Sequence, residues 1–336
     1  MLMLRYPWLQ PYYDKIINAF QQGYGHHALL FKTEQGIGGD ELVRGVAEWL
    51  MCQSPKGNQP CGACHSCQLF NAGNHPDFYL LEPIENKDIG IDQVREVNEK
   101  VSQRSQQNGN KVVWIKQADR LTEAAANALL KTLEEPTDST YFLLQVDLSA
   151  RLLATIYSRS QPWLISLPCE AEAMAWLATQ LAEKTEEKTA EIRTALEVSH
   201  GRPLSALDML QQGLLEKRRQ LLRQFWQFYT RRSPLELLPH FEKEILFQQL
   251  DWLSAFLRDA LKMKLNVPEQ WVQADFLQAI ARFNQRQSAQ GLLKASQIMQ
   301  QVRSDLLQIN GVNQEIILLD GLTRLITEVF EPEQNY

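Results

Sequence analysis

The fold of this chain is decided by the stretch Ala28-Leu29-Leu30-Phe31-Lys32-Thr33-Glu34-Gln35-Gly36-Ile37-Gly38-Gly39-Asp40. Its apolar first part is typical of a buried strand, and its glycines lead into a helical pattern over residues 41–51. A strand, a glycine-rich loop and a helix in this order are the setting of a phosphate-binding P-loop, G-x-x-x-x-G-K-[ST]. The stretch therefore predicts an α/β domain of the P-loop type.

The P-loop is degenerate at the positions that would bind a nucleotide. In register with the motif, these positions hold Thr33, Gly36, Gly38, Gly39 and Asp40. Gly39 lacks the charge of the lysine that holds the β- and γ-phosphates, and Asp40 puts an anion where magnesium and phosphate would lie. Taken alone, an ordinary glycine-rich turn between a strand and a helix is an equal alternative.

A second nucleotide-site motif is degenerate as well. The apolar run 112–115 is followed by Lys116 and Gln117, where a Walker B strand would deliver two acidic residues. Lys116 replaces a metal-binding carboxylate with a cation, and the amide of Gln117 is not a base near neutral pH. Two degenerate motifs in register predict a nucleotide-binding fold that does not turn over ATP.

Four of the five cysteines form a cluster with the spacing C-x8-C-x2-C-x2-C, namely Cys52, Cys61, Cys64 and Cys67. Four thiolates at this spacing suit tetrahedral Zn²⁺, and a closed Cys₄ shell leaves no open position for catalysis. We therefore expect a structural zinc module over residues 52–67. An iron–sulfur cluster and unligated cysteines are the alternatives.

Length and composition indicate a globular protein of two or three domains. The chain has 336 residues, 44% of them hydrophobic, and a net charge of −6. No run approaches the roughly 18 apolar residues of a membrane span, and no leader pattern opens the chain, so we expect a cytoplasmic protein. The acidic balance disfavours a free-standing nucleic-acid binder.

Apolar runs alternate with helical patterns up to about residue 167, which predicts an α/β domain with a largely parallel sheet. The expected strands are 28–31, 77–81, 112–115, 141–146 and 163–167. After Pro168 the strand patterns end and the chain reads as helical almost throughout. The sequence thus predicts an α/β region followed by an all-α region.

Several motifs identify a family. The stretch 127–136, Asn-Ala-Leu-Leu-Lys-Thr-Leu-Glu-Glu-Pro, with a helix cap expected at Thr122, resembles the signature helix of clamp-loader AAA+ proteins of bacterial DNA polymerase III. Ser158-Arg159-Ser160 resembles their Ser-Arg-Cys motif. The opening Tyr-Pro-Trp-Leu of residues 6–9 and the four cysteines add to a resemblance that covers essentially the whole chain.

The resemblance implies a role for Arg159, because the family presents this arginine as a finger to the ATP site of a neighbouring subunit. A guanidinium stays charged, and its planar donors can bridge phosphate oxygens. A surface arginine without such a role is the alternative. The family's sensor-2 arginine falls on Leu204, so a third part of the nucleotide site is missing, and Arg202, displaced by two residues, does not replace it.

The resemblance also implies an AAA+ architecture of three domains. These are an α/β domain over residues 1–167, a small helical lid over 168–210 and a helical collar over 211–336. The implied partners are the gamma/tau and delta subunits in a heteropentameric loader and, through that complex, the beta sliding clamp and primer-template DNA. The expected function is that of a non-hydrolysing, comparatively rigid subunit that helps to load the clamp during replication.

Two other classes of function remain open. One is an active clamp-loader ATPase of the gamma/tau type, against which the residues at positions 39, 40, 116 and 117 argue. The other is a zinc-dependent nucleic-acid-binding module, which the net charge disfavours. No carboxylate constellation of a polymerase is visible, so a nucleotidyltransferase activity would belong to an associated DNA-directed DNA polymerase and not to this chain.

Overall fold

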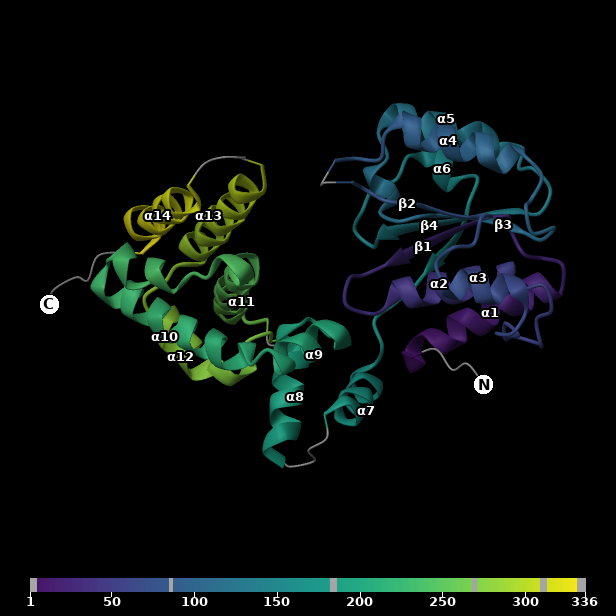
Figure 1. Cartoon of the computed structure of the whole chain (residues 1–336). Helices are drawn as coiled ribbons and strands as arrows, with labels where there is room; N and C mark the ends of the chain where they lie inside the picture. The colour runs from purple at the N-terminus through teal and green to yellow at the C-terminus, as the bar shows by residue number, and fades with distance from the viewer. Residues whose placement is uncertain (1–4, 85–86, 182–185, 268–270, 309–312, 331–336) are drawn as a thin grey trace, which may run out of the picture. The chain divides into compact units, whose positions relative to one another are not determined.

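The computed structural model describes residues 5–84, 87–181, 186–267, 271–308 and 313–330. The chain divides into two compact units, Met1–Trp176 and Leu177–Tyr336, which are described separately (Figure 1). The predicted class, an α/β domain with a parallel sheet followed by an all-α region, is confirmed. The boundaries of separate lid and collar domains stay a prediction.

The first unit is built on a five-stranded parallel sheet with the strand order β2-β3-β4-β1-β5. The strands are β1 (Ala28–Thr33), β2 (Phe78–Leu81), β3 (Lys111–Ile115), β4 (Thr140–Asp147) and β5 (Gln161–Leu164). The central strands are buried on both faces, so their sequences are continuous apolar runs without polar alternation.

The last strand lies earlier than predicted. The apolar run 163–167 was expected to form it, but β5 spans Gln161–Leu164 and contains Pro162. A proline cannot donate to a strand ladder and is therefore confined to edge strands. β5 is such an edge, since it pairs with β1 alone, and its Leu164 is 59% exposed.

Helices cover both faces of the sheet (Figure 1). Helices α1 (Gln10–Gln21), α2 (Gly39–Met51) and α3 (His65–Asn71) lie on one face, and α4 (Ile91–Ser102), α5 (Glu123–Glu134) and α6 (Ala154–Tyr157) lie on the other. Two short 3-10 turns precede helices: η1 (Pro7–Leu9) comes before α1, and η2 (Ala118–Arg120) lies between β3 and α5. Val94 of α4 and Leu129 of α5 share one buried cluster with Leu30, Val113 and Phe142 of the sheet.

Helix α5 begins and ends where the sequence predicts. The Thr122 hydroxyl accepts a hydrogen bond from the Ala125 N–H at 3.2 Å, which satisfies one of the free donors of the first turn. Ala125, Leu129 and Leu133 recur at helical spacing and are buried. The helix ends at Glu134, ahead of Pro136, and this end places Glu134 beside Arg159.

The second unit is helical, and its described residues contain no strand. After α7 (Glu170–Gln180), which crosses from the first unit, its helices are α8 (Glu186–Val198), α9 (Pro203–Gln211), α10 (Leu214–Arg231), α11 (Leu246–Lys264), α12 (Leu277–Asn284), α13 (Ala289–Gln308) and α14 (Gln314–Arg324). The connections contain η3 (Pro234–Glu236), η4 (Leu238–His240), η5 (Lys243–Ile245) and η6 (Ala274–Phe276), and η7 (Leu325–Val329) follows α14. Throughout the described ranges, every helix is too short or too polar to cross a membrane.

Aromatic rings and one buried arginine hold this unit together. Arg218 is fully buried; its Nε donates to Gln273 Oε1 at 2.8 Å and its Nη1 to Asp275 Oδ2 at 2.9 Å. The Gln273 side chain donates in turn to the Trp252 carbonyl at 3.0 Å, and the Arg218 guanidinium lies 5.2 Å from the centroid of the Phe276 ring. A buried charge is tolerated only when its donors are satisfied in this way.

Replacing Arg218 by methionine removes the donors on which Gln273 and Asp275 depend. Breaking one side of a buried ion pair costs about 3–5 kcal/mol of unfolding free energy, and we expect a loss of that size for Arg218→Met in urea denaturation. Arg219→Met is the matched control, because Arg219 is a third exposed and pairs only with Glu216 in the same helix. A loss no larger than that of the control contradicts the structural role of Arg218.

Candidate functional site

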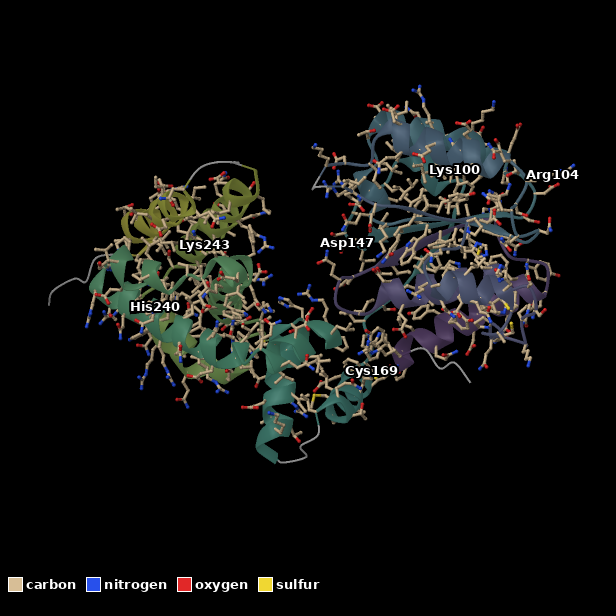
Figure 2. All side chains as sticks on the ribbon, in the orientation of Figure 1. Lys100, Arg104, Asp147, Cys169, His240 and Lys243 are labelled. Carbon is tan, nitrogen blue, oxygen red and sulfur yellow. The ribbon has the colours of Figure 1, made fainter. Side chains whose placement is uncertain are left out.

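The carboxyl ends of three strands bring the degenerate nucleotide-site residues to one edge of the sheet. Thr33 ends β1, Lys116 directly follows β3, and Asp147, labelled in Figure 2, ends β4. Thr33 and Asp147 are partners in the strand register. Open parallel sheets bind ligands at this edge, so the predicted residues occupy the position of a nucleotide site.

Two of the substituted residues bind each other. Lys116 Nζ lies 3.0 Å from Asp40 Oδ2 and 4.6 Å from the centroid of the Trp114 ring. Gln145 donates to Asp40 Oδ1 at 2.6 Å and accepts from Trp114 Nε1 at 3.1 Å. The carboxylate at the magnesium-ligand position is thus neutralised by the ammonium at the Walker B position. The pair is partly solvated and adds at most about 1 kcal/mol to stability, so its main consequence is for the charge of the site.

Thr33 and Gly39 are complementary in shape. A Cβ added to Gly39 would lie 2.7 Å from Thr33 Oγ1, 2.8 Å from its Cγ2 and 2.9 Å from its Cβ. Thr33 is buried at the end of β1, so its branched side chain cannot move aside easily. The side chain at the position of the first P-loop glycine therefore excludes any side chain at the position of the P-loop lysine.

Aromatic side chains of the same chain cover the glycine loop. Trp8 is buried and its Nε1 donates to the Ile37 carbonyl at 2.8 Å. The Tyr6 ring stacks on Trp8 and lies against Gly38, whose φ is +82° and where an added Cβ would come within 2.2 Å of the ring. The edge of Trp176 packs on both rings. Nothing in the sequence indicated what Trp8 packs against.

Two other predicted positions have backbone roles. Gly36 has a φ of +82° and shapes the loop, as only glycine does without strain. Gln117 is exposed, has a φ of +50° and begins the turn η2. Neither offers a charged group to a phosphate or to a metal ion.

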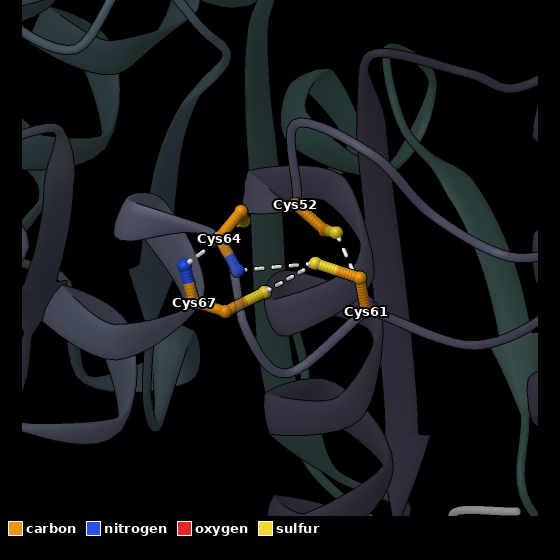
Figure 3. Close-up of side chains that lie close together, drawn as sticks. All are labelled: Cys52, Cys61, Cys64 and Cys67. Atoms are coloured by element: carbon orange, nitrogen blue, oxygen red, sulfur yellow. Dashed lines mark hydrogen bonds between the residues drawn. The ribbon is translucent and has the colours of Figure 1, made fainter.

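The four clustered cysteines come together as predicted, and their side chains point toward one another (Figure 3). Their sulfur atoms all lie within 4.8 Å of one another, and Cys61 Sγ is 4.0 Å from Cys67 Sγ. A tetrahedral Zn²⁺ with bonds of about 2.3 Å places its sulfur ligands roughly 3.8 Å apart. The cluster is therefore suited to a metal ion. Cys169, labelled in Figure 2, is exposed and takes no part in it.

Backbone N–H groups in the module are directed at the sulfur atoms. Cys61 N–H donates to Cys52 Sγ at 3.2 Å, Cys64 N–H to Cys61 Sγ at 3.3 Å and Cys67 N–H to Cys64 Sγ at 3.4 Å. Hydrogen bonds from the backbone of Ala63 and Cys64 lower the pKa of the Cys61 thiol to about 6. Such donors favour the thiolate form that metal binding requires.

The cysteine module is fixed to the sheet domain at both ends. Cys52 directly follows α2, and Cys64 caps the N-terminus of α3. Ser66 donates to the Met51 carbonyl at 2.6 Å and contacts His75 Nε2 at 2.8 Å. His75 is therefore engaged in anchoring the module and is not a fifth ligand.

Arg159 follows α6 and is held by its own subunit. Its Nε donates to Glu134 Oε1 at 2.7 Å, and its Nη2 contacts the same oxygen. Its Nη1 donates to the Thr155 carbonyl at 2.9 Å and to Ser158 Oγ at 3.3 Å. Ser160, at the family's cysteine position, is buried and donates to the Ile156 carbonyl at 2.9 Å, so the exchange leaves the turn intact.

The sequence did not reveal the contact of Glu134 with Arg159. The two partners are 25 residues apart, so no local pattern in the sequence connects them. In the second unit, Arg202 Nε donates to the Ser199 carbonyl at 2.8 Å, and Leu204 lies in α9. That Arg202 does not replace the sensor-2 arginine stays a prediction.

The fit between Thr33 and Gly39 can be tested by a substitution that adds one methyl group at position 39. Gly39→Ala should lower the unfolding free energy by about 1–3 kcal/mol through overpacking, although alanine favours a helix more than glycine does. Gly109→Ala is the control, because nothing lies within 4 Å of its added Cβ. In a Thr33→Gly background the Gly39→Ala penalty should disappear. An equal penalty in both backgrounds, measured by urea denaturation, would refute the complementarity.

Family models match two long segments of the chain. Family models described as "DNA polymerase III, delta subunit" and "DNA polymerase III, delta subunit, C terminal" match residues 9–168 and 212–327. A solved structure, a DNA polymerase III gamma subunit-related protein from Thermotoga maritima, is similar with 20% identity and a TM-score of 0.46, over 95% of this chain and 98% of that one.

Curated relatives match over nearly their full length. DNA polymerase III subunit delta' of Haemophilus influenzae is 57% identical over 98% of this chain and 99% of its own. The corresponding subunit of Escherichia coli is 36% identical over 95% of both chains. The expected membership of the clamp-loader proteins is thereby confirmed: the chain belongs to the family of DNA polymerase III delta' subunits.

Proposed function

We propose that this chain is a non-hydrolysing clamp-loader subunit that supplies Arg159 to the ATP site of an adjacent gamma/tau subunit. In this role it helps to load the beta sliding clamp on primer-template DNA. The observation that carries the proposal is an asymmetry. The chain's own nucleotide site is filled and charge-paired by its own residues, whereas the arginine that would act on a neighbour's nucleotide is present on the surface.

The closed site explains why the chain should not hydrolyse ATP. Three features each oppose a bound nucleotide: the Thr33 side chain fills the loop, the Tyr6 ring covers Gly38, and Lys116 neutralises the Asp40 carboxylate at the magnesium-ligand position. Phosphoryl transfer depends almost entirely on positioning and on charge stabilisation by a lysine and Mg²⁺. A chain that offers neither is expected to be inert toward ATP.

Arg159 can act without a nucleotide site of its own. An arginine finger supplied in trans stabilises the charge that develops on the transferred phosphoryl group. The Arg159 side chain is 33% exposed at the end of α6, so another subunit can reach it. Leu153, the N-cap of α6, and Tyr157, its last residue, are exposed as well and offer apolar contact area to that subunit.

The helical unit supports assembly into a hetero-oligomer. Leu293 and Leu307 of α13, and Ile316 and Leu319 of α14, are 51%, 61%, 59% and 40% exposed. Exposed apolar side chains in such number are typical of surfaces that bind other proteins. We propose that this unit forms the collar with gamma/tau and delta in the cytoplasm, while the sheet domain serves as a rigid stator for delta.

We further propose that the cysteine cluster holds Zn²⁺ in a structural role. All four sulfur atoms are protein ligands, so the shell would be complete and would leave no position for a substrate. When bound, the ion would fix the loop between α2 and α3. The cluster lies next to the end of α2 opposite the glycine loop, so the ion would stabilise the domain without acting on a nucleotide.

The finger is tested in a loader reconstituted from gamma/tau, delta and either the natural chain or Arg159→Ala. Loss of an arginine finger lowers the hydrolysis rate by about 10³-fold or more at the site it serves. We therefore expect a smaller burst of clamp- and DNA-stimulated hydrolysis in single-turnover kinetics. Arg151→Ala, at an exposed arginine shortly before α6, is the matched control. If the burst is unchanged with Arg159→Ala, the finger role is wrong and the chain is only a scaffold in the complex. If the chain hydrolyses ATP alone, the alternative of an active ATPase is supported.

The zinc proposal has a readout independent of ATP hydrolysis. Removal of the ion with a chelator should loosen residues 52–67 and accelerate tryptic cleavage after Lys56, which is exposed in that loop. Cys64→Ser should behave like the stripped protein and bind no zinc, while Cys169→Ser should retain about one zinc per chain. Stripping the metal without any change in cleavage at Lys56 contradicts a structural role.

A further inference from the structure

The guanidinium of Arg159 is almost fully engaged within its own subunit. Of its five N–H donors, Nε and one on Nη2 contact Glu134, and two on Nη1 are directed at Thr155 and Ser158. One N–H of Nη2 has no contact among the described residues. Bidentate binding of a phosphate needs two parallel N–H groups, so the observed arrangement cannot make it.

Before Arg159 can bind a phosphate through Nε and Nη2, the Glu134 carboxylate must leave the guanidinium. The carboxylate occupies the edge formed by Nε and Nη2, which is one of the two-donor edges with which a guanidinium binds an anion. A carboxylate and a triphosphate on this same edge would repel each other. The contacts of Nη1 with Thr155 and Ser158, by contrast, are with neutral oxygens of the adjoining turn and can stay.

The exchange is energetically accessible. The Arg159 and Glu134 side chains are 33% and 49% exposed, and an ion pair so solvated contributes at most about five-fold to an equilibrium. A triphosphate carries more charge than a carboxylate and can displace it. The pair is weak enough to open on demand, yet it fixes the orientation of the arginine while no phosphate is near.

We propose that Glu134 is a positioning residue for Arg159, holding the guanidinium against its own subunit until the triphosphate of the neighbouring subunit displaces the carboxylate. This inference rests on the proposed function of Arg159. It gives a role to Glu134 at the end of the signature helix. The alternative is that this residue only interacts with solvent or with the helix end. Glu134 contacts no substrate and acts through Arg159 alone.

The test uses the reconstituted loader with Glu134→Gln, which keeps the size and an acceptor oxygen of the side chain but removes its charge. Without the charge of Glu134, the Arg159 guanidinium is released more easily. The apparent KM for ATP should therefore fall by about two- to five-fold, which is the contribution of an exposed ion pair to an equilibrium, with little change in kcat. Glu135→Gln removes the same charge from the neighbouring exposed position and should leave KM unchanged. The same substitution at Glu134 should have no effect in an Arg159→Ala background.

The possible results separate this inference from the function on which it rests. If Arg159→Ala lowers hydrolysis but Glu134→Gln behaves like Glu135→Gln, the positioning role is wrong and the finger stands. A fall in kcat with Glu134→Gln would overturn it too, since Glu134 would then be needed with phosphate bound. An effect of Glu134→Gln that persists without Arg159 would also overturn it. If Arg159→Ala changes nothing, the finger and its positioning residue fail together.

Discussion

The parallel alignment of β1, β3 and β4 is the constraint on which the rest of the domain depends. It brings three strand ends to one edge, so every residue placed there must be compatible with the others in volume and in charge. In this chain the residues at the edge fill its space and pair its charges with one another. A threonine fills the space that a lysine would need, and an ammonium group satisfies the carboxylate that stands at a metal-ligand position.

The parts that could be predicted from the sequence are those set by local pattern. The strands buried on both faces could be recognised as continuous apolar runs. The ends of α5 followed from Thr122 and Pro136, and the cysteine spacing predicted the cluster of four sulfur atoms. Edge strand β5 was misplaced because a solvent-facing strand has no such run and tolerates Pro162. The contact of Arg159 with Glu134 could not be predicted, because it depends on how α6 packs beside α5.

In the proposed function, two ion pairs of similar chemistry have opposite roles in this domain. Lys116 and Asp40 lie between aromatic and amide side chains that hold both partners, and nothing else is expected to bind there. Arg159 and Glu134 lie at the ends of two helices, where a second protein can compete for the cation. Both pairs are partly solvated, so the neighbouring side chains and the competing partner, more than burial or distance, would decide what each pair does.

The mutual fit of Thr33 and Gly39 also bears on how such a chain can change over generations. Recovering a working P-loop would need a glycine at one position and a lysine at the other, and either substitution alone leaves a void or a clash. The charges at positions 40 and 116 would have to be exchanged as well. If the chain is inert toward ATP, as proposed, no single substitution would restore hydrolysis, and selection would act on what the chain does for its neighbours.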